Sequence, residues 1–274
     1  MKQILRTLTL LTLVVLMLGC NRKKSSQHEC GSGVNVAPVA VLTQSDNEPR
    51  VDIPDAVFKN YLLEEVVYNI LPFEQGKSVA GVRFYDTVYL PTAQKIDSNG
   101  DGEISIAEAE RILFLKVNGL DIKSFTGLEY FPNLEGLVVN SVDSPRLDLS
   151  NNAKLKHLDC RKNNLAALDL SKNSELRVLY CGGNKLSALD LTANSALERV
   201  DCANNQLSSL DLSNNVALEY VDCSSNQLTT LDVSKNTQLT ALYCDYNPLT
   251  TLCVAAGHTF GHLSTPEDTT IANK

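Results

Sequence analysis

One pattern returns every 21 residues between Leu147 and Leu252, with no insertion or deletion. Four series of identical residues mark it. They are Leu147, Leu168, Leu189, Leu210, Leu231 and Leu252; Cys160, Cys181, Cys202, Cys223 and Cys244; Asn152, Asn173, Asn194, Asn215 and Asn236; and Asn163, Asn184, Asn205, Asn226 and Asn247. A strict period of this length is typical of a solenoid in which each repeat forms one coil.

Each repeat divides into two halves. The first, as in residues 155–165, alternates apolar residues along a short strand and ends near an asparagine, whose side chain can bond backbone groups that a turn leaves unpaired. The second, as in residues 168–173, is another short extended segment with its own turn. Because a single coil cannot bury its apolar face, we expect stacked coils over residues 147–252. The predicted fold is a right-handed leucine-rich-repeat solenoid of short parallel strands and turns, with a small helical N-terminal cap.

The two halves of the repeat resemble internalin-like leucine-rich repeats of cell-envelope lipoproteins from Gram-negative anaerobes. The patterns that carry the resemblance are LxxLxCxxNxL and LDLSxNxxL. It covers the repeats, the segment before them and the N-terminus. It implies the fold specifically, but it implies function only in general terms, since such arrays are generic binding scaffolds.

Residues 1–19 have the pattern of a secretory signal peptide. Lys2 and Arg6 precede an apolar run, Leu8 to Leu18, which is too short to span a bilayer as a helix. Leu18-Gly19-Cys20 looks like a lipobox, and by the resemblance Cys20 is the lipidated first residue of the mature chain. The alternative is an ordinary signal peptide followed by an incidental cysteine. Residues 20–50 lack periodicity and are predicted to be a flexible, lipid-anchored tether.

Charge narrows the choice of partners. Removal of residues 1–19 takes away Lys2 and Arg6 and leaves 22 basic against 32 acidic residues, a net charge of −10. An acidic chain disfavours nucleic acid and anionic membrane surfaces as partners. We expect the protein to be held at the outer membrane by its lipid alone, and we also expect it to be a monomer. Surface display is favoured over a periplasmic orientation, although residues 21–24 are basic where surface-exported relatives tend to be acidic.

Residues 51–146 are predicted to form the N-terminal cap region. A helix is expected from Val51 to Ile70, with Pro54 and Asp55 in its first turn. Its predicted apolar stripe is Val57, Tyr61, Leu62, Glu65 and Val66. Residues 71–96 are read as an insertion of unknown shape. Residues 115–139 have leucine-rich spacing without the asparagines or cysteines, which is expected of an atypical first coil.

Residues 97–108 match the calcium loop of an EF-hand. The predicted ligands are side-chain oxygens of Asp97, Asn99 and Asp101, the Glu103 carbonyl, Ser105 directly or through water, and both carboxylate oxygens of Glu108. Gly102 would permit the sharp turn and Ile104 would anchor the loop to the core. We expect a structural Ca²⁺ with a Kd of roughly 10⁻⁴ to 10⁻³ M. The alternative is a capping box of Ser105 and Glu108 for a helix over residues 106–113, since Pro91 weakens any helix that enters the loop.

Two further series have a plain structural interpretation and an alternative. The five repeat cysteines occupy apolar positions and are predicted to be buried free thiols, with disulfides or a string of bound metals as the alternative. Five aspartates also recur, and each is predicted to accept hydrogen bonds from its own turn, with a cation-binding or ligand-binding strip as the alternative. They are Asp148, Asp169, Asp190, Asp211 and Asp232.

Positions that flank the cysteines form columns on the opposite side of the coils. The candidate binding residues there are His157, Asp159, Tyr180, Arg199, Asp201, Tyr220, Asp222 and Tyr243. Exposed tyrosines beside arginine and aspartate on a rigid strand face are typical of an interaction surface. The alternative is that exposed repeat positions simply vary without a role.

No catalytic motif is evident, so no enzyme is predicted. In the tail, residues 253–274, glycines flanking His258 and His262 argue against a helix, and a closing strand or a loose end is expected. The predicted function is a non-enzymatic, lipid-anchored leucine-rich-repeat protein that binds a protein or glycan at the cell envelope. The alternatives are a structural envelope lipoprotein without a specific ligand, and a Ca²⁺-dependent hydrolase that uses the aspartate column.

Overall fold

The computed structural model describes residues 49–64, 66–68, 93–118, 121–142 and 144–274. All of them belong to one compact unit, Gln44–Lys274. The predicted signal peptide, Cys20 and nearly all of the tether and the insertion lie outside the described residues, and those predictions stay predictions. Within the described ranges, no helix has the length and apolar character needed to cross a bilayer.

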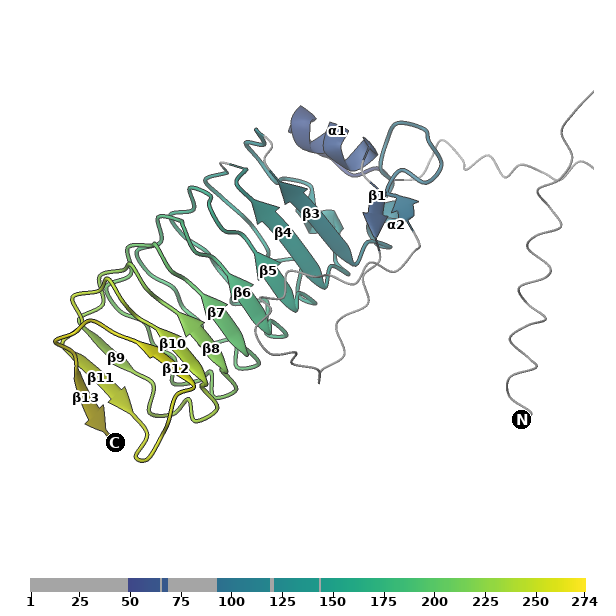
Figure 1. Ribbon diagram of the computed structural model, residues 1–274. Helices are drawn as coiled ribbons and strands as arrows, with labels where there is room; N and C mark the ends of the chain where they lie inside the picture. The colour runs from purple at the N-terminus through teal and green to yellow at the C-terminus, as the bar shows by residue number, and fades with distance from the viewer. Residues whose placement is uncertain (1–48, 65, 69–92, 119–120, 143) are drawn as a thin grey trace, which may run out of the picture. The chain divides into compact units, whose positions relative to one another are not determined.

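Eight short strands form one parallel sheet along the solenoid (Figure 1). In spatial order they are β12 (His262–Ser264), β10 (Ala241–Tyr243), β8 (Tyr220–Asp222), β7 (Arg199–Asp201), β6 (Val178–Tyr180), β5 (His157–Asp159), β4 (Gly136–Asn140) and β3 (Phe114–Asn118). Leu158 pairs with Leu137 on one side and with Leu179 on the other, so neighbouring strands are offset by 21 positions. The leucine-rich-repeat solenoid predicted from the period is confirmed.

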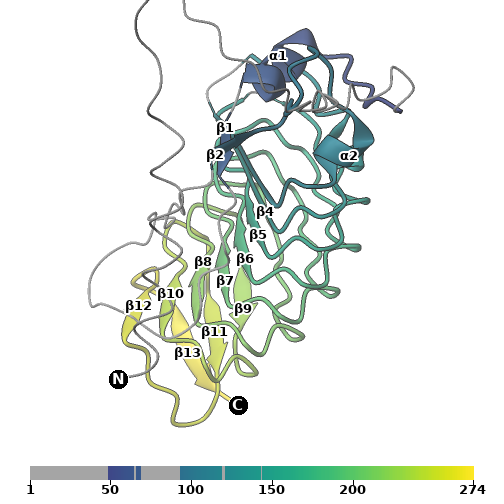
Figure 2. The same cartoon turned by 90° about the vertical axis from the view of Figure 1, so that its right-hand side faces the viewer.

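The second side of the coils forms a strand ladder only at the C-terminal end of the described chain. There β9 (Thr230–Asp232), β11 (Thr251–Val254) and β13 (Thr270–Asn273) make a three-stranded parallel sheet (Figure 2). The tail thus supplies a closing strand to each sheet, β12 to the first and β13 to the second.

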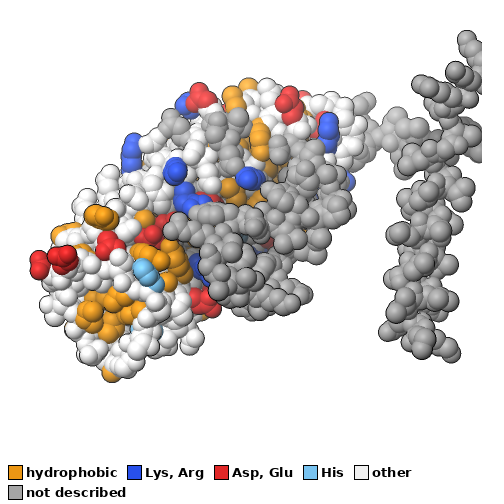
Figure 3. All heavy atoms as spheres, in the orientation of Figure 1, with side chains coloured by type: hydrophobic (Ala, Val, Ile, Leu, Met, Phe, Trp, Pro, Cys, Tyr) orange, Lys and Arg blue, Asp and Glu red, His pale blue; other side chains and the backbone are white. Residues whose placement is uncertain are grey.

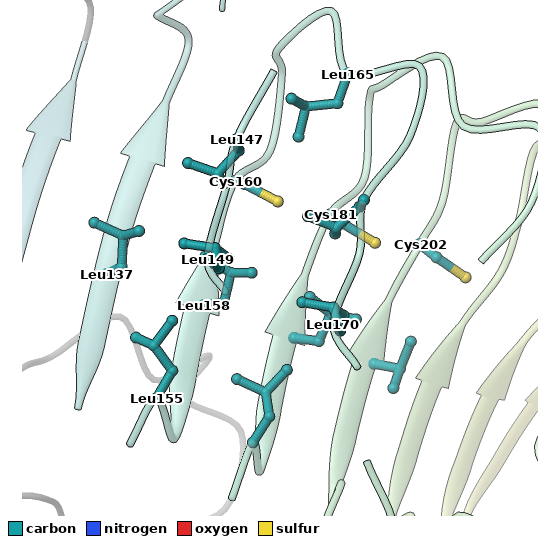
Figure 4. Close-up of a cluster of buried hydrophobic side chains, with 14 of the residues drawn as sticks. Leu137, Leu147, Leu149, Leu155, Leu158, Cys160, Leu165, Leu170, Cys181 and Cys202 are labelled. Atoms are coloured by element: carbon teal, nitrogen blue, oxygen red, sulfur yellow. The ribbon is translucent and has the colours of Figure 1, made fainter. Parts of the chain in front are cut away.

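The core is a continuous stack of leucines and cysteines that fills the space between the two sides of the coils. Leu155, Leu158 and Cys160 point inward from the strand side, and Leu165 and Leu170 point inward from the rest of the same coil (Figure 4). The cluster of buried apolar residues extends from Val51 in the cap to Val254 in the last coils. Each coil therefore covers the apolar face of its neighbour, which is how a repeat too small to fold alone becomes stable.

Two asparagine ladders join the coils. In the first, the Nδ2 amide of Asn184 donates to the carbonyls of Cys160 (3.0 Å) and Cys181 (2.8 Å), and its Oδ1 accepts from the Leu165 amide (3.1 Å). In the second, Asn194 donates to the carbonyls of Leu170 (3.1 Å) and Asn173 (2.8 Å). The same pattern recurs in coil after coil. These side chains satisfy buried backbone groups of the preceding coil, which explains why both series keep the strict period.

The N-terminal cap differs from its prediction. Helix α1 is Ala56–Glu64, shorter than expected, and β1 (Val66–Tyr68) pairs antiparallel with β2 (Ala93–Lys95). The predicted stripe is right in part: Leu62 is buried and Tyr61 is partly buried against the core, but Val57 is 41% exposed and Phe58 is buried in its place. Asp55 joins the start of the helix to the first coil: its Oδ1 accepts from the Phe58 amide (3.0 Å), and its Oδ2 accepts from the amides of Lys123 (2.8 Å) and Ser124 (3.1 Å). Phe58 then meets Phe125 edge to face, with ring centroids 5.3 Å apart.

The second helix is also shorter than predicted. Helix α2 is Ile106–Ala109, and residues 110–113 between it and β3, which begins at Phe114, are not helical. The helix expected to be weak before the calcium loop is absent from the described residues there, where β2 is a strand. The short 3-10 helix η2 (Leu128–Tyr130) lies in the first coil, whose apolar residues are buried as predicted.

The asparagine ladders generate a graded stability prediction. We expect Asn194→Ala to lower the free energy of unfolding by about 1–3 kcal/mol, because two buried carbonyls lose their donor. Asn205→Ala should cost more, because the Leu186 amide also loses its acceptor. Urea unfolding checks both against Asn214→Ala at an exposed position. Equal stability of the three variants would contradict the role of the ladders.

Candidate functional site

The strand register places the eight candidate binding residues in two adjacent columns of one sheet face. In one column Tyr180 pairs with Asp159 on one side and with Asp201 on the other, and Asp222 and Tyr243 continue the column. The second column is His157, Val178, Arg199, Tyr220 and Ala241. The columns predicted from the period are therefore present. Their role in binding stays a proposal.

In the N-terminal half of this face, the charged side chains make contacts with one another. Arg161 bonds both carboxylate oxygens of Asp159, at 2.9 Å from Nε and 2.6 Å from Nη2, and Asn140 donates to Asp159 as well (3.0 Å). The Arg161 guanidinium also lies 5.0 Å from the centre of the Tyr180 ring. Asp159 is only 4% exposed, so its carboxylate is part of the framework. Burial lowers the pKa of His157, which packs edge to face against Tyr180.

The C-terminal half carries an aromatic group. The Tyr220 and Tyr243 ring centroids are 5.7 Å apart, and the His262 ring stacks on Tyr243 at 4.5 Å. Asp222 accepts from the amide (3.0 Å) and hydroxyl (2.6 Å) of Ser224. His262 was not among the candidates from sequence, although it lies one period after Ala241 and pairs with it. The 21-residue spacing could have identified His262, because the tail keeps that spacing beyond the last residues of the repeated leucine and asparagine series.

Two acidic groups in this half of the face have raised pKa values. Burial raises the pKa of Asp201, and the neighbouring Asp222 carboxylate raises it further. Burial also raises the pKa of Tyr220, with Asp222 and Asp201 adding to the effect. Both shifts have the sign expected where negative charge lies close together in a partly desolvated place.

The cysteine and aspartate series follow their structural interpretations. The five repeat cysteines are buried free thiols, and burial is the main cause that raises their pKa, to about 12 for Cys244. Each aspartate of the other series accepts from the backbone amide two residues later, at 2.8–2.9 Å. Lys274 donates to Asp232 (2.6 Å) and is the first cause that lowers the pKa of Asp232 to about 2. These aspartates serve their turns, as predicted.

The calcium loop is folded around its own carboxylates. Asp97 accepts from the amides of Gly100 (2.7 Å), Asp101 (3.2 Å) and Gly102 (3.1 Å). Asn99 accepts from the Asp101 amide at 2.9 Å. Gly102 has a φ of 80° and so permits the turn as predicted, and Ile104 is 1% exposed.

Glu108 is saturated by protein donors. One oxygen accepts from the amide and hydroxyl of Ser98 (2.8 Å each) and the amide of Asn99 (3.3 Å), and the other from the amide (3.0 Å) and hydroxyl (3.1 Å) of Ser105. Burial acts to raise its pKa, but these hydrogen bonds outweigh burial and lower it. The capping box with Ser105 is confirmed.

These contacts bear on whether the loop fits a cation. The loop offers hard oxygen donors of the kind that Ca²⁺ prefers, but Glu108 could ligate a cation only by releasing Ser98 and Asn99. The Glu103 side chain is bonded to Lys59 (2.7 Å), which leaves its carbonyl as the predicted ligand. Across the described ranges, no group of three His, Cys, Asp or Glu side chains is arranged to hold a metal. Calcium binding therefore stays a prediction.

The sequence and the structure were compared with known proteins. No protein-family model and no curated protein matches the sequence. Among solved structures, the functional domain of InlJ from Listeria monocytogenes, described as including a cysteine ladder, is 26% identical over 56% of this chain and 51% of that chain, with a TM-score of 0.29. The internalin inlF from the same species is 22% identical over 63% of this chain and 64% of that chain, with a TM-score of 0.45. The leucine-rich-repeat fold of this chain rests on its own 21-residue strand register and parallel sheet.

A third solved structure is similar to a comparable part of the chain. YopM, a leucine-rich effector protein from Yersinia pestis, is 28% identical over 59% of this chain and 49% of that chain, with a TM-score of 0.43. The match to these three leucine-rich-repeat structures thus spans between about half and two thirds of their lengths.

The predicted calcium site leads to a prediction about stability. With a Kd of 10⁻⁴ to 10⁻³ M, 10 mM Ca²⁺ should add about 1.4–2.7 kcal/mol to the free energy of unfolding relative to chelator. Asp101→Asn should reduce this gain, because the site loses one negative charge, and should keep the fold, because asparagine can still accept from the Glu103 amide. Equal stability in Ca²⁺, Mg²⁺ and chelator would leave the capping box as the only role of the loop.

Proposed function

We propose that this leucine-rich-repeat protein is a non-enzymatic, lipid-anchored module that binds a protein or glycan at the cell envelope through the face of its eight-stranded sheet. One observation carries the proposal: the register gathers Tyr180, Tyr220, Tyr243 and Arg199 on neighbouring strands of a single face. Tyrosine and arginine are the residue types that most often dominate binding energy at interfaces.

The rigidity of the coils supports the same role. Each strand is short, and the asparagine in the turn after it donates both to that turn and to the preceding coil. The backbone under such a face loses little further freedom when a partner binds, which reduces the entropic cost of association. The sheet face differs in this respect from a binding surface built on loops.

Affinity capture tests the binding face. A soluble chain beginning at Ser26 contains the whole compact unit and is suitable as bait. We expect it to retain a defined protein or glycan from envelope extracts, and we expect Tyr180→Ala with Tyr243→Ala to lose that ligand because the aromatic contacts are gone. Lys172→Ala with Lys235→Ala, both at exposed positions outside the two columns, is the matched control.

Two results would decide against this face. If the parent and the tyrosine variant retain the same material, the sheet face does not bind it. If no bait retains anything above the background of an unrelated protein, a structural envelope lipoprotein without a specific ligand becomes the better account.

The lipid anchor is proposed from the Leu18-Gly19-Cys20 sequence. It would hold the protein at the outer membrane, with the solenoid on the cell surface. Metabolic labelling with a radioactive fatty acid should mark the full chain and should be lost in Cys20→Ala, because the thiol is the acylated group. Equal labelling of both chains would contradict the assignment. Protease treatment of intact cells distinguishes surface from periplasmic display.

A further inference from the structure

The two halves of the sheet face differ in how their charges are balanced. In the N-terminal half, Arg161 pairs with Asp159, and Lys156 pairs with Glu135 at 3.0 Å. At the border, Arg177 of one coil pairs with Glu198 of the next. In the C-terminal half, by contrast, Asp201, Asp222 and Asp245 have no ion pair with any described residue. Arg199 is exposed beside Asp201 and makes no ion pair with a described carboxylate either.

The unbalanced carboxylates lie beside aromatic rings. Asp222 is two residues beyond Tyr220 on the same strand and pairs in register with Tyr243 on the next. The two tyrosine rings are tilted by 45° with centroids 5.7 Å apart. In Figure 3, hydrophobic and aromatic side chains gather around a histidine at the C-terminal end of the molecule, with acidic side chains close by. The face of a tyrosine ring attracts cations, and a nearby carboxylate reinforces the attraction.

Asp222 has capacity left for a ligand. Both of its described hydrogen bonds, from the Ser224 amide and hydroxyl, go to Oδ1. Its Oδ2 has no partner among the described residues, and a carboxylate oxygen can accept more than one bond. Burial is the first cause that raises the pKa of Asp201 and of Tyr220, and Asp222 raises both further, whereas Arg161 acts to lower the pKa of Asp201.

We propose that Asp222, Tyr220 and Tyr243 bind an arginine or lysine side chain of an extended protein segment. The inference rests on the proposed function and specifies which end of the sheet face binds and what chemistry it recognises. A guanidinium or ammonium group would lie against the tyrosine rings, pair with Asp222 and offset the Asp201 charge. A neutral glycan would leave these carboxylates uncompensated, and an acidic glycan would be repelled.

The test uses short fluorescent peptides in which serine alternates with arginine, with glutamine or with glutamate. Fluorescence anisotropy with the chain from Ser26 should show binding of the arginine peptide only, weakening with salt. Asp222→Asn should weaken it by roughly three- to ten-fold, the loss of one cation contact at a partly exposed site. Tyr243→Leu should weaken binding similarly, whereas Tyr243→Phe should retain it, because the ring face is kept.

The matched control is Asp211→Asn. It removes the same charge from the same coil, and Asp211 also accepts from the amide two residues later, but it belongs to the other aspartate series. We expect it to leave the affinity unchanged. Equal weakening by Asp211→Asn and Asp222→Asn would overturn the inference, since an acidic protein would then be attracting cations without a site. Equal binding of the arginine and glutamine peptides would overturn it too.

The remaining outcome separates this inference from the proposed function. An oligosaccharide or protein whose binding depends on Tyr243 but is indifferent to Asp222→Asn would refute the cationic site and leave the binding face standing. Failure of the affinity capture together with Asp222-dependent binding of the arginine peptide would keep the cationic site and remove the envelope ligand.

Discussion

Satisfying the buried backbone at each turn is the constraint on which the rest of the structure depends. The turns after Cys181 and Cys202 point carbonyls into the interior, and the amide of Asn205 bonds both. Because that side chain reaches from one coil to the preceding one, a coil with a residue more or less would leave these groups unpaired. The strict period is thus a hydrogen-bonding requirement as well as a packing requirement, and it sets the register of every strand.

Fixed register determines what the sheet face presents. Side chains one period apart become neighbours, so a column can be tuned one coil at a time without disturbing the core. In the N-terminal half the columns are used for internal pairs, with Arg161 closing over Asp159. In the C-terminal half the same positions leave Asp222 beside Tyr220 and Tyr243, with no basic partner among the residues described. We propose that one scaffold carries a stabilised half and a half that binds a partner.

The sequence predicts the features that depend on the 21-residue period, and it misses features that depend on particular side-chain contacts or on distant segments. The columns, the buried thiols and the turn aspartates follow from the period alone. The length of α1 does not, because β1 ends it by pairing with β2, which lies beyond residues 71–92 and outside any local window. The buried face of α1 follows from contacts with a distant segment: Asp55 accepts from the amides of Lys123 and Ser124, and Phe58 packs on Phe125. Saturation of Asp159 and Glu108 depends on contacts with Arg161 and Ser98 that no spacing reveals.

The most direct test of this account is hydrogen exchange at the asparagine side chains, followed by nuclear magnetic resonance in D₂O. The ladder amides are buried and donate both hydrogens to carbonyls, as Asn152 does to Leu128 (3.0 Å) and Phe131 (2.9 Å). They should exchange as slowly as core backbone amides. The exposed Asn151 and Asn214 should exchange at once. Fast exchange of the ladder amides would contradict the claim that asparagines hold the coils in register.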